Sequence, residues 1–154
     1  MISLRPHTRE DVPLRIKWLN NKNANTFLTD DPNHVTDTKE QNEWFDRYEA
    51  DPNKKFFTIL AGEVPIGFTG LSNINTDSKS ASVFIVIGED DFRGKGNGGT
   101  ILDLLLTEGR KLGIETFALD VFKDNIPAVR LYTNAEFVKT GEIDDSMISM
   151  ELSL

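Results

Sequence analysis

A glycine-rich segment in the second half of the chain has the residues best suited to hold a ligand. Its sequence is Arg93-Gly94-Lys95-Gly96-Asn97-Gly98-Gly99, hereafter the glycine loop, and it lies between a predicted strand and a predicted helix. Glycines let a backbone approach a phosphate closely, and the first turn of a helix presents unpaired N–H groups with partial positive charge. With the charges of Arg93 and Lys95, this segment predicts a phosphate or pyrophosphate cradle.

The spacing inside the glycine loop excludes one kind of nucleotide site and leaves another open. A Walker A motif needs a Lys and then a Ser or Thr directly after its last glycine, whereas Gly99 is followed by Thr100. Gly94, Gly96 and Gly99 do match the dinucleotide fingerprint G-x-G-x-x-G, and Asp120 falls where a ribose-binding acid would lie. Against a dinucleotide domain, the motif comes late in a short chain.

Thiol and zinc chemistry are excluded by the residues available. The chain has no cysteine, so disulfides, thiolate ligands and cysteine nucleophiles are ruled out. His7 and His34 lie far apart and have no third residue in a zinc-binding pattern. We therefore expect no metal site, and we expect Trp18 and Trp44 in the core rather than in a pocket.

The first half of the chain predicts two helices and a set of antiparallel strands. A strand at 2–5 is followed by a helix that begins with a capping-box pattern from Thr8 to Asp11. The segment 21–38 is polar, with a short helical turn expected at Phe27-Leu28, and a second helix runs from Thr38 to about residue 50. Strands at 56–61, 65–73 and 80–88 are joined by short turns and predict a meander.

The second half alternates helices and strands. Helices are expected at 99–112 and 126–134, and strands at 116–122 and 147–152. The strands at 80–88 and 116–122 are joined through a helix, so they should be parallel with a right-handed crossover. The predicted fold class is α/β (α+β) with a mixed, mostly antiparallel sheet flanked by helices, in a single domain over residues 1–154.

Charge and hydropathy limit the partners of the chain. The formal net charge is −8 over 154 residues, which argues against a nucleic-acid binder because such proteins carry a basic surface. An acidic surface is compatible with a cationic amine as substrate, and acids such as Asp30-Asp31 would also serve solubility alone. No segment is apolar over the roughly 20 residues that span a bilayer. We expect no membrane partner and a cytoplasmic location.

Two motifs resemble those of the GNAT superfamily of acyl-CoA-dependent N-acetyltransferases. The glycine loop contains Arg93-x-x-Gly96-x-Gly98, similar to the family signature Q/R-x-x-G-x-G/A. The stretch from Asp120 to Tyr132 resembles the family segment in which an Asn, here Asn125, opens a helix and a Tyr follows seven residues later. The resemblance covers nearly the whole chain. The start, with Arg9-Glu10-Asp11 and Trp18-Leu19-Asn20, resembles the subgroup that acetylates ribosomal-protein N-termini. The segment with Glu40-Gln41 and Trp44-Phe45 is similar to the acetyltransferases of nucleotide-activated amino sugars.

This resemblance implies a fold and a site. The parallel strands should splay apart, with the pantetheine arm of acetyl-CoA in the gap, paired with the backbone of Ile85, Val86 and Ile87. The N–H groups of the glycine loop should bind the pyrophosphate, and Asn125 should contact the pantetheine arm. A backbone N–H, that of Val86, would polarise the thioester carbonyl. Tyr132 matches the family's general acid, which protonates the departing thiolate.

The sequence departs from the family pattern at two points. The family has a glycine before the Phe that follows the last helix, whereas this chain has Glu136 before Phe137, and we expect Asn134 to take over the left-handed conformation. Relatives often carry a catalytic Glu on the strand before the loop, but residues 80–88 contain no acid. Glu89, directly after this strand, is the candidate general base, and a water chain or a substrate amine that is already partly neutral would also serve.

The predicted function is transfer of an acetyl group from acetyl-CoA, as co-substrate, to a primary amine. The acceptor would be a protein N-terminus, an amino sugar or a small amine, and the resemblance suggests a homodimer. The missing strand acid leaves open a non-catalytic acyl-CoA-binding or sensor domain. The glycine spacing and Asp120 leave open a small NAD-binding protein.

Overall fold

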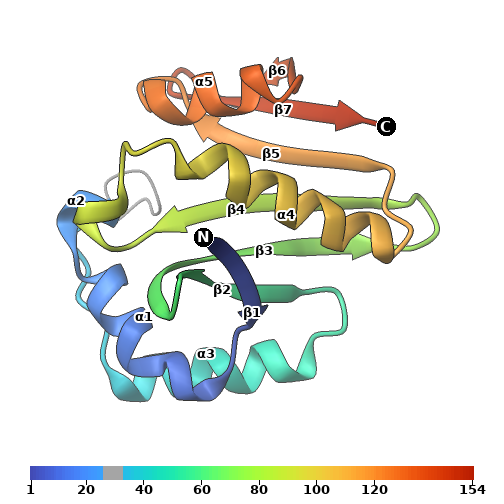
Figure 1. The fold of residues 1–154 in the computed structure, drawn as a ribbon. Coiled ribbons are helices and arrows are strands. Elements are labelled where there is room, and N and C mark those ends of the chain that lie inside the picture. The colour runs from blue at the N-terminus through green and yellow to red at the C-terminus, as the bar shows by residue number, and fades with distance from the viewer. Residues whose placement is uncertain (26–32) are drawn as a thin grey trace.

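Seven strands form one sheet in the order β1-β2-β3-β4-β5-β7-β6. The computed structural model describes residues 1–25 and 33–154 (Figure 1). The strands are β1 (Ile2–Pro6), β2 (Lys55–Ala61), β3 (Val64–Asn75), β4 (Ser80–Ile87), β5 (Thr116–Phe122), β6 (Val138–Glu142) and β7 (Met147–Ser153). The helices are α1 (Val12–Leu19), α2 (Lys22–Asn25), α3 (Thr38–Ala50), α4 (Asn97–Lys111) and α5 (Ile126–Asn134), with short 3-10 turns at Arg9–Asp11 and Asp90–Phe92.

The predicted fold class is confirmed. β1 to β4 pair antiparallel in chain order, β4 and β5 are parallel, and β5, β7 and β6 pair antiparallel. The sequence prediction missed β6 and α2, and it began α4 two residues late, at Gly99 instead of Asn97. The turn predicted at Phe27-Leu28 and the acids Asp30-Asp31 lie outside the described residues.

Alternating side chains of the central strands face two layers of helices. On one face, α4 and α5 pack on the sheet, and Leu102 and Leu105 join Val83 and Phe117 in the main hydrophobic cluster. In Figure 1, α4 crosses in front of the central strands and α5 lies beside β5. On the other face Trp18 of α1, fully buried, packs against Phe68 and Val86. The prediction that Trp18 belongs to the core is therefore confirmed.

The predicted capping box fixes the start of the first helical segment. The backbone N–H of Thr8 donates to a carboxylate oxygen of Asp11 at 2.9 Å, and the reciprocal bond of the capping box is also present. Arg5 adds two hydrogen bonds to the Asp11 carboxylate, at 2.7 and 2.9 Å. Burial raises the pKa of Asp11, but the bonds from Arg5, Thr8 and Thr58 outweigh it and lower the pKa to about 2.

His7 belongs to a buried polar network rather than to a ligand site. Its Nδ1 lies 2.7 Å from the Thr58 hydroxyl, and its Nε2 lies 3.1 Å from the guanidinium of Arg15. Arg15 is also buried, stacks over Trp44 and donates to Gln41, so it joins α1 to α3. Burial and the neighbouring Arg15 lower the pKa of His7 to about 3. The neutral ring can therefore accept from Arg15 at ordinary pH.

The connection after α5 corrects one expectation. Glu136, with φ of 73°, takes the left-handed conformation that the sequence analysis assigned to Asn134. Asn134 remains the last residue of α5. The helix needs one more turn residue before the chain reverses, and Ala135 supplies it as the C-cap.

Candidate active site

The parallel pair β4 and β5 separates soon after it forms. Only three residue pairs join the strands: Ser80 with Thr116, Ala81 with Phe117, and Ser82 with Ala118. β4 then continues to Ile87 without pairing to β5, and Figure 1 shows the two strands diverging toward the glycine loop. Unpaired backbone groups are costly to leave without a partner. The opening is therefore suited to a ligand that can hydrogen-bond like a strand.

The register with β3 decides which groups of β4 face this opening. Gly88 and Glu89 both donate their N–H to the carbonyl of Ile66, and the carbonyl of Phe84 accepts from the Thr69 hydroxyl of β3. Backbone groups of successive strand residues alternate in direction. Those of Val86 therefore face β3, and those of Ile85 and Ile87 face the opening. The carbonyl of Val86 lies so close to β3 that a Cβ on Gly67 would approach it to 2.0 Å.

The glycine loop meets the requirements of an anion cradle. Gly94 and Gly96 have φ of 73° and 80°, and Gly96 is the N-cap of α4. A Cβ added at Gly94, Gly96 or Gly99 would meet no atom within 4 Å, so the space over this backbone is open. The first N–H groups of α4 have no partner within the helix. These neutral donors fit a pyrophosphate, with the helix dipole directed at it.

The two cations of the glycine loop differ in their surroundings. The guanidinium of Arg93 donates to the Ile87 carbonyl at 2.8 and 3.2 Å and to Asp90 at 2.7 Å. Arg93 thus fastens the loop to the end of β4, on the side of the opening. Lys95 is exposed and forms no ion pair with the residues that the structure describes.

α5 brings two of the predicted residues to the other border of the opening. Asn125 is the N-cap of α5 and its side chain accepts from the N–H of Ala128 at 3.4 Å. Leu131 lies against the first turn of α4, because a Cβ on Gly98 would approach it to 3.1 Å. The second half of α5 therefore packs against the first turn of α4. Tyr132, the next residue of α5, lies in the main hydrophobic cluster.

Tyr132 is a buried phenol in the main hydrophobic cluster. Its side chain is 6% exposed and packs edge-on against Phe137, with the ring centroids 5.5 Å apart. Its hydroxyl has no hydrogen-bond partner among the described residues, although buried Tyr hydroxyls usually find one. Burial raises the pKa of Tyr132 to about 12. Such a group is expected where a ligand atom completes the environment.

Glu89 lies in the turn after β4 and is held by α1. One carboxylate oxygen accepts from Lys17 at 2.9 Å and the other from the indole N–H of Trp18 at 2.5 Å. The bond from Lys17, supported by that from Trp18, lowers the pKa of Glu89. Gly88 makes this arrangement possible, because a Cβ there would lie 2.1 Å from the Trp18 ring. No sequence pattern near Glu89 indicated this attachment apart from the glycine at the end of the strand.

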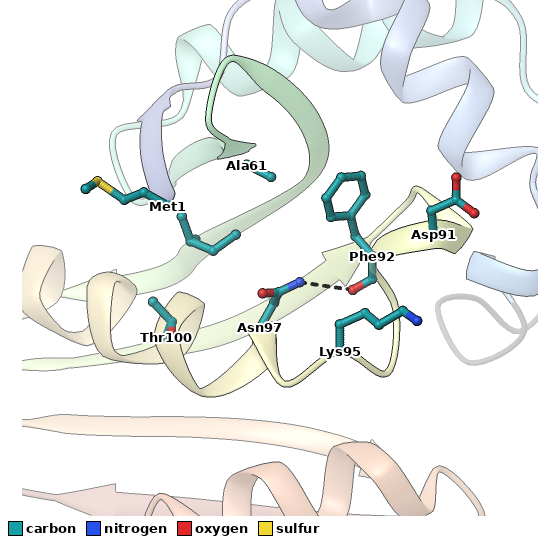
Figure 2. A pocket seen from close by; sticks show the side chains of 8 residues that line it. Met1, Ala61, Asp91, Phe92, Lys95, Asn97 and Thr100 are labelled. Atoms are coloured by element: carbon teal, nitrogen blue, oxygen red, sulfur yellow. Dashed lines mark hydrogen bonds between the residues drawn. The ribbon is translucent and has the colours of Figure 1, made fainter.

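A hollow of about 660 Å³ lies on the other side of the glycine loop. Figure 2 shows it between the start of the chain and the first turn of α4, with the Asn97 side chain donating to the Phe92 carbonyl. It is lined by Met1, Ile2, Ala61, Asp91, Phe92, Lys95, Asn97 and Thr100. It shares Lys95 and Asn97 with the glycine loop but does not include Tyr132 or the opening.

Two classes of site find no support in the described part of the chain. No group of three or more His, Cys, Asp or Glu side chains there could hold a metal ion. No helix among these residues has the length and apolar character needed to cross a membrane.

Known proteins resemble this chain in sequence and in fold. A family model described as "Acetyltransferase (GNAT) domain" matches residues 2–138. Acetyltransferase PseH of Campylobacter jejuni is 28% identical over 88% of this chain and 82% of its own. The structure of spermidine N-acetyltransferase from Vibrio cholerae, in complex with CoA and spermine, superposes with a TM-score of 0.90, covering 99% of this chain and 95% of that one at 24% identity. A domain from Methanocaldococcus jannaschii gives a TM-score of 0.86 at 20% identity, covering 100% of this chain and 99% of that one.

Proposed function

The chain belongs to the GNAT acetyltransferase family, and we propose that it transfers the acetyl group of acetyl-CoA to the nitrogen of a primary amine. The observation that carries this proposal is the opening between β4 and β5, which leads to a glycine-rich helix N-terminus. Acetyl-CoA supplies a thioester carbonyl that an amine can attack. Its amide-containing arm can pair with the open edge of β4, and its pyrophosphate can bind the N–H groups at the start of α4. The two surfaces must therefore lie next to each other.

Binding of acetyl-CoA is assigned mostly to backbone groups. Ile85 and the N–H of Ile87, whose carbonyl already accepts from Arg93, would pair with the pantetheine arm. The loop from Gly94 to Gly99 would bind the pyrophosphate. Asn125 has a carboxamide N–H₂ group that its capping bond does not use, and it would contact the arm. We assign polarisation of the carbonyl to an N–H of Ile85 or Ile87 instead of Val86, whose backbone groups face β3. Arg93 would contribute by fixing the loop, and Lys95 by its charge.

Tyr132 is the proposed general acid. Its pKa of about 12 means that the phenol remains protonated at every pH at which the protein would work. A departing thiolate would provide the hydrogen-bond partner that the buried hydroxyl does not find among the residues that the structure describes. As the C–N bond forms and the C–S bond breaks, the nitrogen gives up a proton and the sulfur gains one, here from Tyr132, which is then reprotonated from solvent.

Glu89 remains the predicted general base. Its lowered pKa keeps the carboxylate ionised, so it is unprotonated when the amine arrives, and the same shift makes it a weaker base than an ordinary Glu. Its bonds to Lys17 and Trp18 would fix its orientation.

The acceptor is proposed to be a small primary amine. PseH and the spermidine N-acetyltransferase of Vibrio cholerae carry the names of acetyltransferases, and the second of these was solved with spermine. A protein N-terminus stays a prediction, as do a homodimer and a cytoplasmic location.

The proposal can be tested with the pure protein in two steps. The unfolding temperature should rise with acetyl-CoA, because a ligand at a hundred times its dissociation constant adds about 2.7 kcal/mol of stability. It should not change with NAD. Release of the CoA thiol should then depend on added amine, using spermidine, an amino sugar nucleotide and a peptide as acceptors. Stabilisation by NAD alone would refute the transferase assignment, whereas acetyl-CoA binding without thiol release would indicate a sensor domain.

A further inference from the structure

Asp120 is a carboxylate on the strand that borders the opening. It lies in β5 between Leu119 and Val121, which are both buried in the cluster under α4 and α5. Side chains alternate along a strand, so Asp120 faces the opposite side of the sheet, where it is exposed. β5 is a central strand, and Asp is among the residues least favoured in strands. An Asp at this position therefore calls for a reason other than folding.

The register places Asp120 at the start of the opening. The last pair that joins β4 to β5 is Ser82 with Ala118. Asp120 is the next residue of β5 on the same face as Ala118. Its side chain is therefore the first on this face beyond the point where the sheet opens, on the side of the sheet that α4 and the glycine loop do not occupy.

Asp120 has a second carboxylate near it on its own face of the sheet. The side chains of β4, β5 and β7 on this face include one other charged group, Glu151, which lies opposite Ala118. Asp120 forms no ion pair with the residues that the structure describes, whereas both oxygens of Glu89 are engaged by α1. A ligand with a phosphate or carboxylate would meet repulsion here, and an ammonium group would find an unpaired carboxylate.

We propose that Asp120 binds the ammonium group of the acceptor and that the acceptor is a cationic amine without a phosphate, such as a di- or polyamine. This assignment rests on the proposed acetyl transfer. With acetyl-CoA held from the α4 side, the amine would approach the opening from the opposite face. The bound ammonium group then loses one proton, by way of water, to the general base proposed above, Glu89. The neutral amine nitrogen then attacks the thioester carbon.

The test compares Asp120→Asn with wild type, using spermidine as acceptor and thiol release as the rate. Because Asp120 is exposed, its ion pair with the ammonium group is partly screened by solvent, and its loss should raise KM for spermidine by about 2- to 5-fold. The dissociation constant for acetyl-CoA and the unfolding temperature should not change, since Asp120 is exposed, and Asp120→Glu should restore part of the affinity. Glu115→Gln is the matched control, because it removes one charge at the paired end of the β4–β5 strands, and it should behave as wild type.

The other outcomes distinguish failure of the role proposed for Asp120 from failure of the proposed acetyl transfer. If wild type acetylates spermidine and Asp120→Asn has an unchanged KM, the role of Asp120 is refuted while the transferase function stands. The same holds if Glu89→Gln, and not Asp120→Asn, raises KM. If wild type binds acetyl-CoA but transfers only to a phosphate-bearing amino sugar, the cationic acceptor is refuted. If wild type does not bind acetyl-CoA, the proposed function fails and the role of Asp120 fails with it.

Discussion

Replacing Tyr132 by Phe should change stability and activity in opposite directions. The substitution removes a hydroxyl that is buried and has no partner among the described residues. An unsatisfied buried polar group costs roughly 1–3 kcal/mol, and the small void left by the missing oxygen offsets part of that gain. We expect Tyr132→Phe to be more stable by about 1 kcal/mol, which raises the unfolding temperature by about 2–4 °C for a domain of this size.

The same change should lower the turnover number. Loss of a general acid typically costs 10²- to 10⁴-fold, so kcat for thiol release should fall by roughly that factor. The affinity for CoA should change little, because the proposed binding uses backbone groups.

Tyr48→Phe provides the control for this reasoning. The Tyr48 hydroxyl accepts a hydrogen bond from the Phe56 N–H at 2.7 Å. Its removal should therefore reduce stability by about 0.5–1.5 kcal/mol and leave kcat unchanged. Urea unfolding monitored by circular dichroism measures the stability of both variants, and thiol release measures kcat. If Tyr132→Phe loses stability as Tyr48→Phe does, the hydroxyl has a partner in the free protein and the argument is refuted.

Three further changes test features of the fold. Gly88→Ala puts a Cβ 2.1 Å from the Trp18 ring and should cost about 1–3 kcal/mol by urea unfolding; an unchanged midpoint would mean that α1 moves freely. Glu136→Gly relieves the strain of the left-handed φ of 73° and should raise the free energy of unfolding by up to about 1 kcal/mol. A lower unfolding temperature by calorimetry would contradict this. His7 has its pKa lowered from 6.5 to about 3 by burial and Arg15, so the unfolded state binds more protons and stability should fall as pH drops from about 6.5 toward 3. His7→Gln should flatten that decline, and an unaltered slope would show that His7 is charged in the folded state.

Local sequence patterns predicted most of the elements that carry the site. The bounds of β5 and α5 match their predicted ranges, because Asn125 marks the helix start and Gly113 ends the helix before β5. The crossover between β4 and β5 followed from the handedness of such connections. β6 was missed because Val138, Lys139, Thr140 and Glu142 are exposed and show no apolar alternation, so the strand depends on pairing with β7.

The chemistry of individual site residues was less predictable. Sequence spacing treated Arg93 as a phosphate ligand, but its donors are directed to Ile87 and Asp90. Sequence spacing also could not show that the backbone groups of Val86 face β3, since their direction depends on the register between the strands. The attachment of Glu89 to α1 joins residues 71 and 72 positions apart in the chain. Contacts at such separations follow from tertiary packing and not from local pattern.

The opening in the sheet also has a mechanical consequence. The four strands before it and the three after it are joined through only three residue pairs, together with the contacts of α4 and α5. A co-substrate arm lying between β4 and β5 would act as an additional strand, and its binding would convert two loosely joined sheets into a continuous one. Amide hydrogen exchange in β5 and β7 should then slow when CoA is present, while exchange in β2 and β3 should change much less. The gap that admits the co-substrate would thus make the rigidity of the molecule depend on that co-substrate.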